Sequence, residues 1–372
     1  MNLTIALLPG DGIGPEVSAQ AVKCLRAVEE IFGHQFKFIE GVVGAKAIDK
    51  TGNPLPDSTL KLCKEADAVL FGAIGDPKYD NDPDAKIRPE QGLLKLRKEL
   101  ELFSNIRPVK VFPTLIDKSP LKKKIIRGTD FVIYRELIGG IYFGEKHLSK
   151  DGTVASDLCT YSEAEISRIA HMAFKAAKTR RKKVTLVDKA NVLESSRLWR
   201  KVVSKIGESY PEVALEFLFI DNAAMQLILN PSQFDVILTE NMFGDILSDE
   251  GSVIGGSIGL LPSASVGESH ALFEPIHGSY PQAKDKDIAN PIASILSTAM
   301  LLDHFKLDEE SKAVVIAVLK SMKNDIVTPD LDKNSKYGTN DVGDFISSNI
   351  RELDDHPTIN RENIWLGKST II

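Results

Sequence analysis

Short apolar runs alternate with segments of helical periodicity along most of the chain. Residues 3–8 are apolar apart from Thr4, and after the turn Gly10-Asp-Gly-Ile-Gly14 apolar side chains recur every three or four positions from Val17 to Phe32. The first pattern predicts a buried strand, and the second predicts a helix that ends at Gly33. The repeated alternation of the two patterns is typical of an α/β fold.

The same two patterns predict the other elements of the chain. Strands are expected at residues 36–39, 68–71, 105–112, 129–135, 184–187, 213–220 and 235–239. Helices are expected at residues 90–103, 163–180, 290–305, 310–324 and 341–350. Ser162 and Glu165 have the spacing of a capping box for the helix that begins at residue 163.

Residues 141–162 alternate between polar and apolar side chains and contain Asp151-Gly152, a dipeptide typical of a hairpin turn. A hairpin of this length with few core residues would expose much of its surface in a single subunit. We therefore expect an arm at about residues 141–162 that packs against a second subunit.

The composition fits a globular protein of one large domain or two smaller ones. The chain has 372 residues, 43% of them hydrophobic, and about 150 residues per domain is typical. A net charge of −6 argues against a nucleic-acid or anionic-membrane partner. The three cysteines are far apart, the first residues resemble a strand and not a signal peptide, and no apolar run approaches the ~18 residues of a membrane span. We expect a cytoplasmic location.

The run Asn241-Met-Phe-Gly-Asp-Ile-Leu-Ser-Asp249 lies between a predicted strand and a glycine-rich stretch. Asp245 and Asp249 are four residues apart, so a helix places both carboxylates on one face. Such carboxylates repel each other unless a cation lies between them, and Mg²⁺ prefers oxygen ligands. An isolated pair of this kind is more often a solvated helix face. Its position between strand and glycines favours a metal site.

Other motifs carry charged residues near strand ends or on helices. Arg97 shares a helix face with Leu93 and Leu94, which suits either a pocket for an anion with an apolar branch or an amphipathic helix whose arginine reaches solvent. Arg135 ends a strand, and Lys189 directly follows another. Polar residues at strand ends are common site positions.

The turn Gly10–Gly14 has some features of a dinucleotide-binding fingerprint. However, Pro15 occupies the position of the third glycine. Glu40 is also too far along the chain to be the acid that binds the ribose. The sequence therefore does not predict a Rossmann fold.

Taken in order, several motifs resemble the isocitrate/isopropylmalate β-decarboxylating dehydrogenase family. They are GDGIGPEV, LRK with NIRP, RELIGGIYFG, VDKANV, NMFGDILSD, GSIGLLPSAS and EPIHGS with IANP, and they span nearly the whole chain. The resemblance implies an α/β fold with a large mixed sheet, unlike a Rossmann fold, and a homodimer with shared active sites. It implies a first domain of residues 1–102 plus 256–372 and a second domain of residues 103–255.

The same resemblance implies the reaction. The closest motifs are those of the branch that oxidises and decarboxylates 3-isopropylmalate with NAD and Mg²⁺ or Mn²⁺, in leucine biosynthesis. Homoisocitrate, isocitrate and tartrate are alternative substrates within the family. A different class of function, a non-catalytic regulatory subunit, would be expected to lack Tyr142, Lys189 or one of the aspartates, and all are present.

Residue roles also follow from the resemblance. Tyr142 would be the general acid, and Lys189 of the partner subunit would be the general base. Asp245 and Asp249 would hold the metal with Asp221 of the other subunit, which would also face the substrate. The other residues implied to contact the substrate are Glu90, Leu93, Leu94, Arg97, Arg107 and Arg135.

The residues implied to bind the cofactor are Ile13, Glu274, His277, Gly278, Ser279, Gln282 and Asn290. One of them departs from the family pattern. NAD-using members have an aspartate where this chain has Gln282, and NADP-using members place a lysine and a tyrosine at the pair that is Gln282-Ala283 here. Because Gln282 keeps an acceptor without the charge, NAD remains the expected cofactor, while Lys284 and Lys286 leave NADP open.

Overall fold

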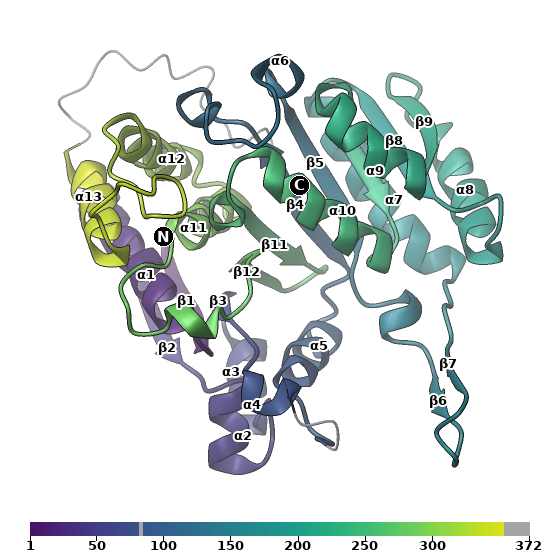
Figure 1. Ribbon diagram of the computed structural model, residues 1–372, viewed down its shortest axis with the longest axis horizontal. Coiled ribbons are helices and arrows are strands. Elements are labelled where there is room, and N and C mark those ends of the chain that lie inside the picture. The colour runs from purple at the N-terminus through teal and green to yellow at the C-terminus, as the bar shows by residue number, and fades with distance from the viewer. Residues whose placement is uncertain (82–84, 353–372) are drawn as a thin grey trace.

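The computed structural model describes residues 1–81 and 85–352. Ten strands form one sheet (Figure 1), which includes every strand predicted outside the hairpin. In spatial order they are β2 (Gln35–Glu40), β1 (Asn2–Gly10), β3 (Ala68–Ala73), β12 (Ala271–Pro275), β11 (Pro262–Val266), β4 (Ser104–Lys110), β5 (Asp130–Glu136), β10 (Val236–Thr239), β8 (Lys183–Asp188) and β9 (Ala214–Phe219).

Neighbouring strands are parallel at both ends of the sheet and antiparallel in its middle. Strand β11 pairs antiparallel with β12 and with β4, and β4 pairs antiparallel with β5. The remaining pairs are parallel. This pattern confirms the predicted large mixed sheet, which differs from the mostly parallel sheet of a Rossmann fold.

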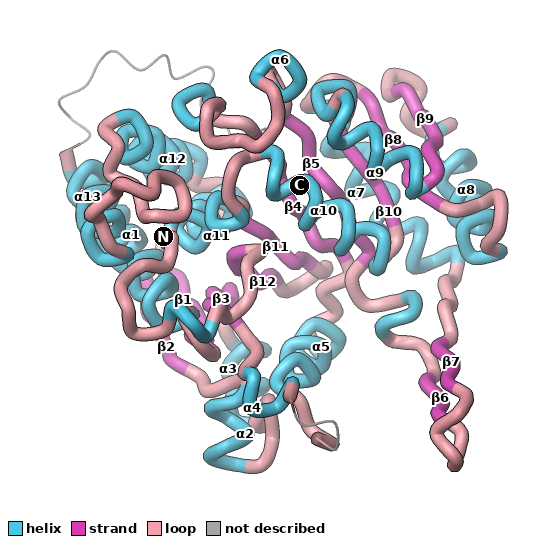
Figure 2. The backbone as a smooth tube through the Cα atoms, viewed as in Figure 1, coloured by secondary structure: helices cyan, strands magenta, loops and turns pink. Residues whose placement is uncertain are grey.

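Helices flank the band of strands on both sides (Figure 2). They are α1 (Gly14–Phe32), α2 (Ala45–Thr51), α3 (Asp57–Glu65), α4 (Pro77–Asp80), α5 (Pro89–Glu99), α6 (Lys123–Ile126), α7 (Glu163–Thr179), α8 (Glu194–Gly207), α9 (Ile220–Leu229), α10 (Asn241–Ile254), α11 (Ile292–His304), α12 (Asp308–Lys323) and α13 (Thr339–Arg351). Within the described ranges, no helix is long and apolar enough to cross a membrane.

Local signals in the sequence explain several helix ends. Gly33 adopts a left-handed conformation with φ 70° and ends α1, as predicted. The capping box of Ser162 and Glu165 begins α7, also as predicted. The helix predicted at residues 90–103 is shorter in the structure, because Glu101 has φ 53° and the chain turns there toward β4.

Residues 141–162 form a hairpin arm with strands β6 (Lys146–Leu148) and β7 (Ala155–Asp157), which projects from the body of the molecule (Figure 1). Its strands are exposed along their whole length. The hairpin itself is confirmed, and its packing against a second subunit remains a prediction.

The main hydrophobic cluster extends from Leu3 to Ile350 and includes strands from both ends of the sheet. The division into residues 1–102 plus 256–372 and residues 103–255 remains a prediction, since one continuous sheet joins the two parts. Residues 353–372 of the predicted first domain lie outside the described residues.

Candidate active site

Helix α10 carries two aspartates one turn apart. Glu240 caps the helix by accepting a hydrogen bond from the Phe243 N–H at 2.8 Å. The buried side of the helix faces β4 and β5, while the Asp245 and Asp249 side chains remain 35% and 64% exposed. The helix predicted from the sequence is therefore present, with both carboxylates partly exposed.

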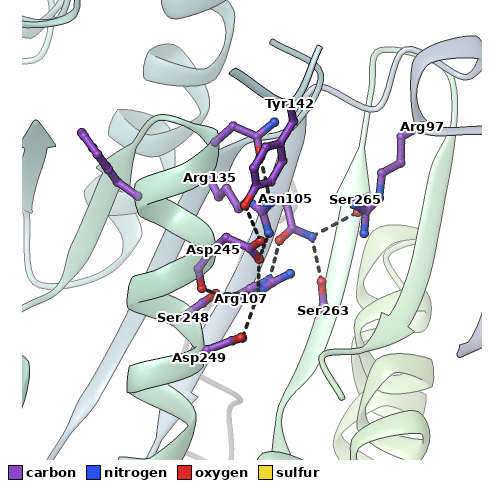
Figure 3. Close-up of polar contacts among 12 residues, drawn as sticks. Arg97, Asn105, Arg107, Arg135, Tyr142, Asp245, Ser248, Asp249, Ser263 and Ser265 are labelled. Carbon is purple, nitrogen blue, oxygen red and sulfur yellow. Dashed lines mark hydrogen bonds and ion pairs between the residues drawn. The ribbon is translucent and has the colours of Figure 1, made fainter. Parts of the chain in front are cut away.

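Two buried arginines reach these aspartates from the neighbouring strands β4 and β5 (Figure 3). Arg135 donates a hydrogen bond from Nη1 to Asp245. Arg107 Nη1 lies 3.6 Å from an Asp245 oxygen and 3.7 Å from an Asp249 oxygen. The arrangement concentrates two guanidiniums and two carboxylates in one place.

Arg107 is oriented by a relay of hydrogen bonds that crosses the middle of the sheet. Its Nε donates to Asn105 Oδ1 at 2.6 Å, and Asn105 Nδ2 donates to the hydroxyls of Ser263 at 2.7 Å and Ser265 at 3.1 Å. Its Nη1 also donates to Ser248. The sequence did not predict these partners, because β11 has no clear strand pattern and its serines resemble loop residues.

Burial and neighbouring charges change the pKa values of these arginines and aspartates. Burial, assisted by Arg135, lowers the pKa of Arg107 to about 10, and burial also lowers the pKa of Arg135. Burial acts to raise the pKa of Asp245, but Arg135 and Arg107 outweigh it and hold that pKa below the ordinary value. The pKa of Asp249 is raised, mainly by burial. The arginines thus keep Asp245 ionised.

Tyr142 completes this group of side chains. It lies at the end of a 3₁₀ turn, Gly140–Tyr142, in which Gly140 has φ 70°. Its hydroxyl donates to Asp245 Oδ2 at 3.0 Å, and its ring lies 5.8 Å from the Arg135 guanidinium carbon. Burial and the Asp245 carboxylate raise the pKa of Tyr142, so its hydroxyl keeps its proton. We call Arg107, Arg135, Tyr142, Asp245 and Asp249 the arginine cluster.

Arg97 lies apart from the two aspartates, on helix α5 (Figure 3). Its Nη2 donates to Glu274 Oε1 at 2.8 Å. Arg97, Glu274 and Leu93 line a cavity of about 120 Å³ that also reaches Arg107. Leu94 and Glu90 are half-buried on the same helix, and they are not among the residues that line this cavity.

Lys189 and Asp221 form a separate pair. Lys189 follows β8, its backbone N–H donates to Ser196 Oγ at 3.0 Å, and its amine contacts the Asp221 carboxylate. The two side chains are 27% and 63% exposed. Hydrogen bonding from Lys189 lowers the pKa of Asp221. We call these two residues the lysine pair.

The lysine pair is not joined to the aspartates of α10 within one chain. Over residues 1–81 and 85–352, no three or more His, Cys, Asp or Glu side chains gather in a group that could hold a metal ion. Within a single chain, Asp245 and Asp249 therefore lie together, whereas Asp221 lies at a different place.

A second cavity, of about 360 Å³, lies beside the turn at residues 10–14. Its lining residues are Ile13, Ser257, Ile258, Gly259, His277, Gly278, Tyr280, Ile288, Ala289, Asn290 and Asp330. The Ile13 N–H donates to the Ser279 carbonyl at 2.8 Å. A Cβ at Gly12 would lie 1.9 Å from that carbonyl oxygen, so the close approach of turn and loop requires glycine there.

The residues predicted to bind a cofactor fall into three places. Ile13, His277, Gly278 and Asn290 line the 360 Å³ cavity. Glu274 lines the smaller cavity with Arg97, and Ser279 is buried beside the turn. Gln282 is exposed on the 3₁₀ turn Pro281–Ala283 and is not among the lining residues of either cavity.

Asp330 is a lining residue that the sequence analysis missed. Its carboxylate accepts hydrogen bonds from Asn290 Nδ2 at 3.0 Å and from the Ser257 hydroxyl at 2.6 Å. It thereby ties two walls of the cavity together. No local pattern marks this residue, since its partners are distant in the sequence.

Comparisons with known proteins agree on one family. The family model described as isocitrate/isopropylmalate dehydrogenase matches residues 4–346. The chain is 54% identical to a 3-isopropylmalate dehydrogenase of Bacteroides fragilis, over 95% of this chain and 100% of that protein. It is 51% identical to one of Aquifex aeolicus, over 94% and 98%. Among solved structures, isocitrate dehydrogenase from Methylococcus capsulatus superposes with a TM-score of 0.85 at 34% identity, over 94% and 99%.

Proposed function

Because this chain belongs to the isocitrate/isopropylmalate dehydrogenase family, we propose that it catalyses the oxidative decarboxylation of (2R,3S)-3-isopropylmalate. The products are 4-methyl-2-oxopentanoate and carbon dioxide, in leucine biosynthesis. The relatives that are at least half identical over nearly their whole length carry the name 3-isopropylmalate dehydrogenase, and this supports the assignment.

The observation that carries the proposal is the arginine cluster. Arg107 and Arg135 are buried guanidiniums, and each is suited to bind a carboxylate of a malate-type acid through paired N–H donors. Arg97 lines the 120 Å³ cavity with Arg107 and Leu93, so a charged end and an apolar wall lie together. Leu93 favours an apolar branch on the substrate over the third carboxylate of isocitrate.

The donor set on α10 fits a divalent cation such as Mg²⁺ or Mn²⁺. Asp245 and Asp249 provide hard oxygen ligands on one face, and their mutual repulsion favours a cation between them. A third carboxylate, Asp221, comes from a second copy of the chain in this proposal. When bound, the cation stabilises negative charge that develops on the substrate oxygen.

The chain's own groups supply the proton transfers. Lys189 of the second copy would accept the proton of the substrate's 2-hydroxyl, and a bound NAD would supply the hydride acceptor. Loss of carbon dioxide then leaves an enolate, and Tyr142 donates its proton to the enolate carbon. The hydrogen bond from Tyr142 to Asp245 orients that hydroxyl in the absence of substrate.

A homodimer with shared sites is part of the proposal. Exposed apolar side chains lie on α9 and α10, next to the aspartates: Met225 and Leu229 on α9, and Ile246 and Val253 on α10. The hairpin arm adds Leu148, Val154 and Leu158. Apolar surface of this extent favours burial against another subunit.

NAD is the proposed cofactor, in the 360 Å³ cavity. Among the described residues that line it there is an acid, Asp330, and no lysine or arginine, a composition that disfavours a 2′-phosphate. Gln282 lies two residues beyond the lining residue Tyr280 and keeps an acceptor without charge. Replacing it with aspartate should raise the preference for NAD about five- to tenfold. An unchanged ratio of kcat/KM for NAD and NADP would show that this position does not contact the ribose.

The proposed cytoplasmic location rests on the three free cysteines, which are far apart in the sequence and of which Cys24 and Cys63 are buried.

Initial rates on a panel of malate-type acids test the activity directly. We expect 3-isopropylmalate to have the highest kcat/KM with NAD and Mg²⁺, ahead of isocitrate, homoisocitrate and tartrate. The variant Arg135→Ala should lose turnover of every acid on the panel, which serves as a control against contaminating enzymes. A higher kcat/KM for a tricarboxylic acid would overturn the substrate assignment.

A further inference from the structure

Asn241 is the first residue of α10 and is completely buried. Its side-chain oxygen accepts two hydrogen bonds from Arg135, from Nη2 at 2.7 Å and from Nε at 3.1 Å. Its side-chain nitrogen donates to the Gly139 carbonyl at 3.1 Å. The amide thus uses its acceptor on an arginine of the arginine cluster and its donor on a different segment of the chain.

The segment that Asn241 holds leads directly to the proposed acid. Gly139 precedes the 3₁₀ turn Gly140–Tyr142, and the Gly140 N–H donates to the Thr160 carbonyl at 3.2 Å. One side chain is therefore bonded to the guanidinium of Arg135 and to the turn that carries the Tyr142 hydroxyl. Both of these groups meet again at Asp245, since Arg135 and Tyr142 each donate to its carboxylate.

We propose that Asn241 is a positioning residue that sets the Tyr142 hydroxyl relative to the substrate carboxylate bound by Arg135. This inference rests on the proposed function. In that reaction the acid has to reach one particular carbon of an enolate whose position is set by the arginines, and a displacement of about 1 Å can cost a hundredfold in rate. A side chain that is hydrogen-bonded to both Arg135 and the turn prevents such a displacement.

Tyr161 fixes the backbone of Asn241. Its hydroxyl accepts the backbone N–H of Asn241 at 3.0 Å and donates to Glu240 Oε2 at 3.0 Å. Its ring packs edge-on against Trp199, with ring centroids 5.4 Å apart. Because Tyr161 is 6% exposed and bonded on both sides, the start of α10 has little freedom to move.

The same tyrosine ring explains the two glycines before Tyr142. A Cβ at Gly139 would lie 2.9 Å from Tyr161 Cε1, and a Cβ at Gly140 would lie 2.2 Å from Tyr161 Oη. The turn therefore rests directly on the ring that anchors Asn241. Helix start, arginine and turn share one rigid support, and Asn241 is the side chain that connects them.

An asparagine is required because the site uses one acceptor and one donor. Arginine has only N–H groups, so the atom facing Arg135 must be the amide oxygen, and the amide nitrogen then faces Gly139. Aspartate has nearly the same shape but no donor, so its second oxygen would face the Gly139 carbonyl oxygen. The variant Asn241→Asp therefore keeps an acceptor for Arg135 and breaks the contact to the turn, and it also adds a negative charge beside Arg135.

The experiment measures the two halves of the reaction separately in the dimeric enzyme with Mg²⁺. Single-turnover formation of reduced cofactor reports hydride transfer. Exchange of the C3 hydrogens of 4-methyl-2-oxopentanoate in D₂O, followed by NMR, reports the proton transfer assigned to Tyr142. Calorimetry reports the affinity for 3-isopropylmalate, which the arginines bind in this proposal.

For Asn241→Asp we expect C3 exchange to fall about ten- to hundredfold, the effect of one lost hydrogen bond and an unpaired carbonyl. Substrate affinity should fall, because the added charge competes with the substrate carboxylate for Arg135, but hydride transfer at saturating substrate should change less than about threefold, since the Arg135 contact remains. The matched control is Gln20→Glu, an amide-to-acid change at a buried position on α1, where the amide donates to Asn340. This control should leave all three measurements unchanged.

Equal losses of hydride transfer and exchange in Asn241→Asp, or no loss of exchange, would overturn the inference. If Asn241→Asp does not fold, Tyr161→Phe decides, because it removes the hydroxyl that anchors Asn241 and keeps the ring. Exchange should then fall more than hydride transfer, and the reverse order would overturn the inference. A wild-type enzyme that neither oxidises 3-isopropylmalate nor exchanges the ketoacid would instead refute the proposed function.

Discussion

The arginine cluster and the lysine pair are built from similar charges in very different surroundings. The side chains of Arg107 and Arg135 are 8% and 3% exposed, and each is fixed by several hydrogen bonds. Lys189 and Asp221 are far more exposed, and the lysine amine contacts Asp221 and lies 5.9 Å from the Phe219 ring. Folding of one chain completes the first arrangement, whereas the second presents its charges at the surface.

This difference indicates how the work of the site is divided. Buried charges are stable only with fixed partners, so the arginine cluster is rigid before any ligand binds. An exposed ion pair contributes little to stability and can exchange partners readily. The lysine pair is therefore suited to meet the arginine cluster of another chain.

The largest effect should come from combining inactive subunits. Lys189→Ala and Asp245→Ala should each lower kcat by roughly a thousandfold, since one removes the base and the other a metal ligand. If the site is shared, mixed dimers contain one complete site, and equal mixtures should recover about a quarter of wild-type activity. The activity of the mixture after subunit exchange checks this.

A mixture of Lys189→Ala with Lys189→Arg is the control, because no hybrid of these two contains an intact site. Failure of the first mixture to recover activity, with subunit exchange confirmed by mass spectrometry, would place all the catalytic residues in one chain.

The next contrast concerns stability. Asp245→Ala leaves two buried guanidiniums facing each other without their carboxylate, which should cost about 3 kcal/mol of unfolding free energy. Asp221→Ala removes only a partner of an exposed lysine and should have no measurable effect. Urea unfolding at several protein concentrations measures both and separates unfolding from dissociation. Equal costs would mean that the two regions are equally buried in the assembled protein.

The effect of bound metal on the stability of the folded protein should be somewhat smaller. At a Mg²⁺ concentration of about 100 times Kd, binding to the folded state should add about 2.7 kcal/mol to stability. Asp245→Asn should abolish the thermal shift, and chelation should abolish turnover. Asp151→Asn, on the exposed arm, is the matched control. Full activity in the chelated enzyme would contradict the metal assignment.

The smallest effect should appear in the titration of the aspartates. Lys189 lowers the pKa of Asp221 through a hydrogen bond, so Lys189→Met should raise that pKa toward its ordinary value. In a dimer with shared sites the same variant removes a cation near Asp245 of the other chain, whose pKa should also rise. NMR titration of labelled aspartates checks both. An Asp245 pKa that does not respond would contradict the juxtaposition.

The sequence predicted the elements of regular pattern better than those shaped by distant contacts. Helix α10 and its two aspartates followed from local spacing, as did the outer strands. The central strands β11 and β12 were missed. Strand β11 begins with Pro262 and contains Ala264, two residue types that are depleted in strands, and Ser263 and Ser265 break its apolar pattern. Their hydroxyls are there to hold Asn105, a contact that no local pattern reveals.

The candidate site shows the same limit. Spacing alone indicated a metal-binding face on α10, while the roles of the arginines, Tyr142 and Lys189 came from resemblance to a family. Neither source indicated Asp330 or the hydrogen bonds that Asn241 makes to Arg135 and Gly139, because both depend on contacts between segments that are far apart in sequence. Such contacts exist only after the sheet has formed.

The order of strands also has a consequence for the time course of biosynthesis. Strands β12 and β11 lie between β3 and β4 and connect the two ends of the sheet. The facing edges of β3 and β4 therefore stay unpaired until residues 262–275 have been made. About 150 residues separate β4 from β11, and at ~5–20 residues per second the ribosome needs roughly 8–30 s to make them. Throughout that interval the emerging chain carries two open strand edges, which nascent-chain chaperones are suited to cover.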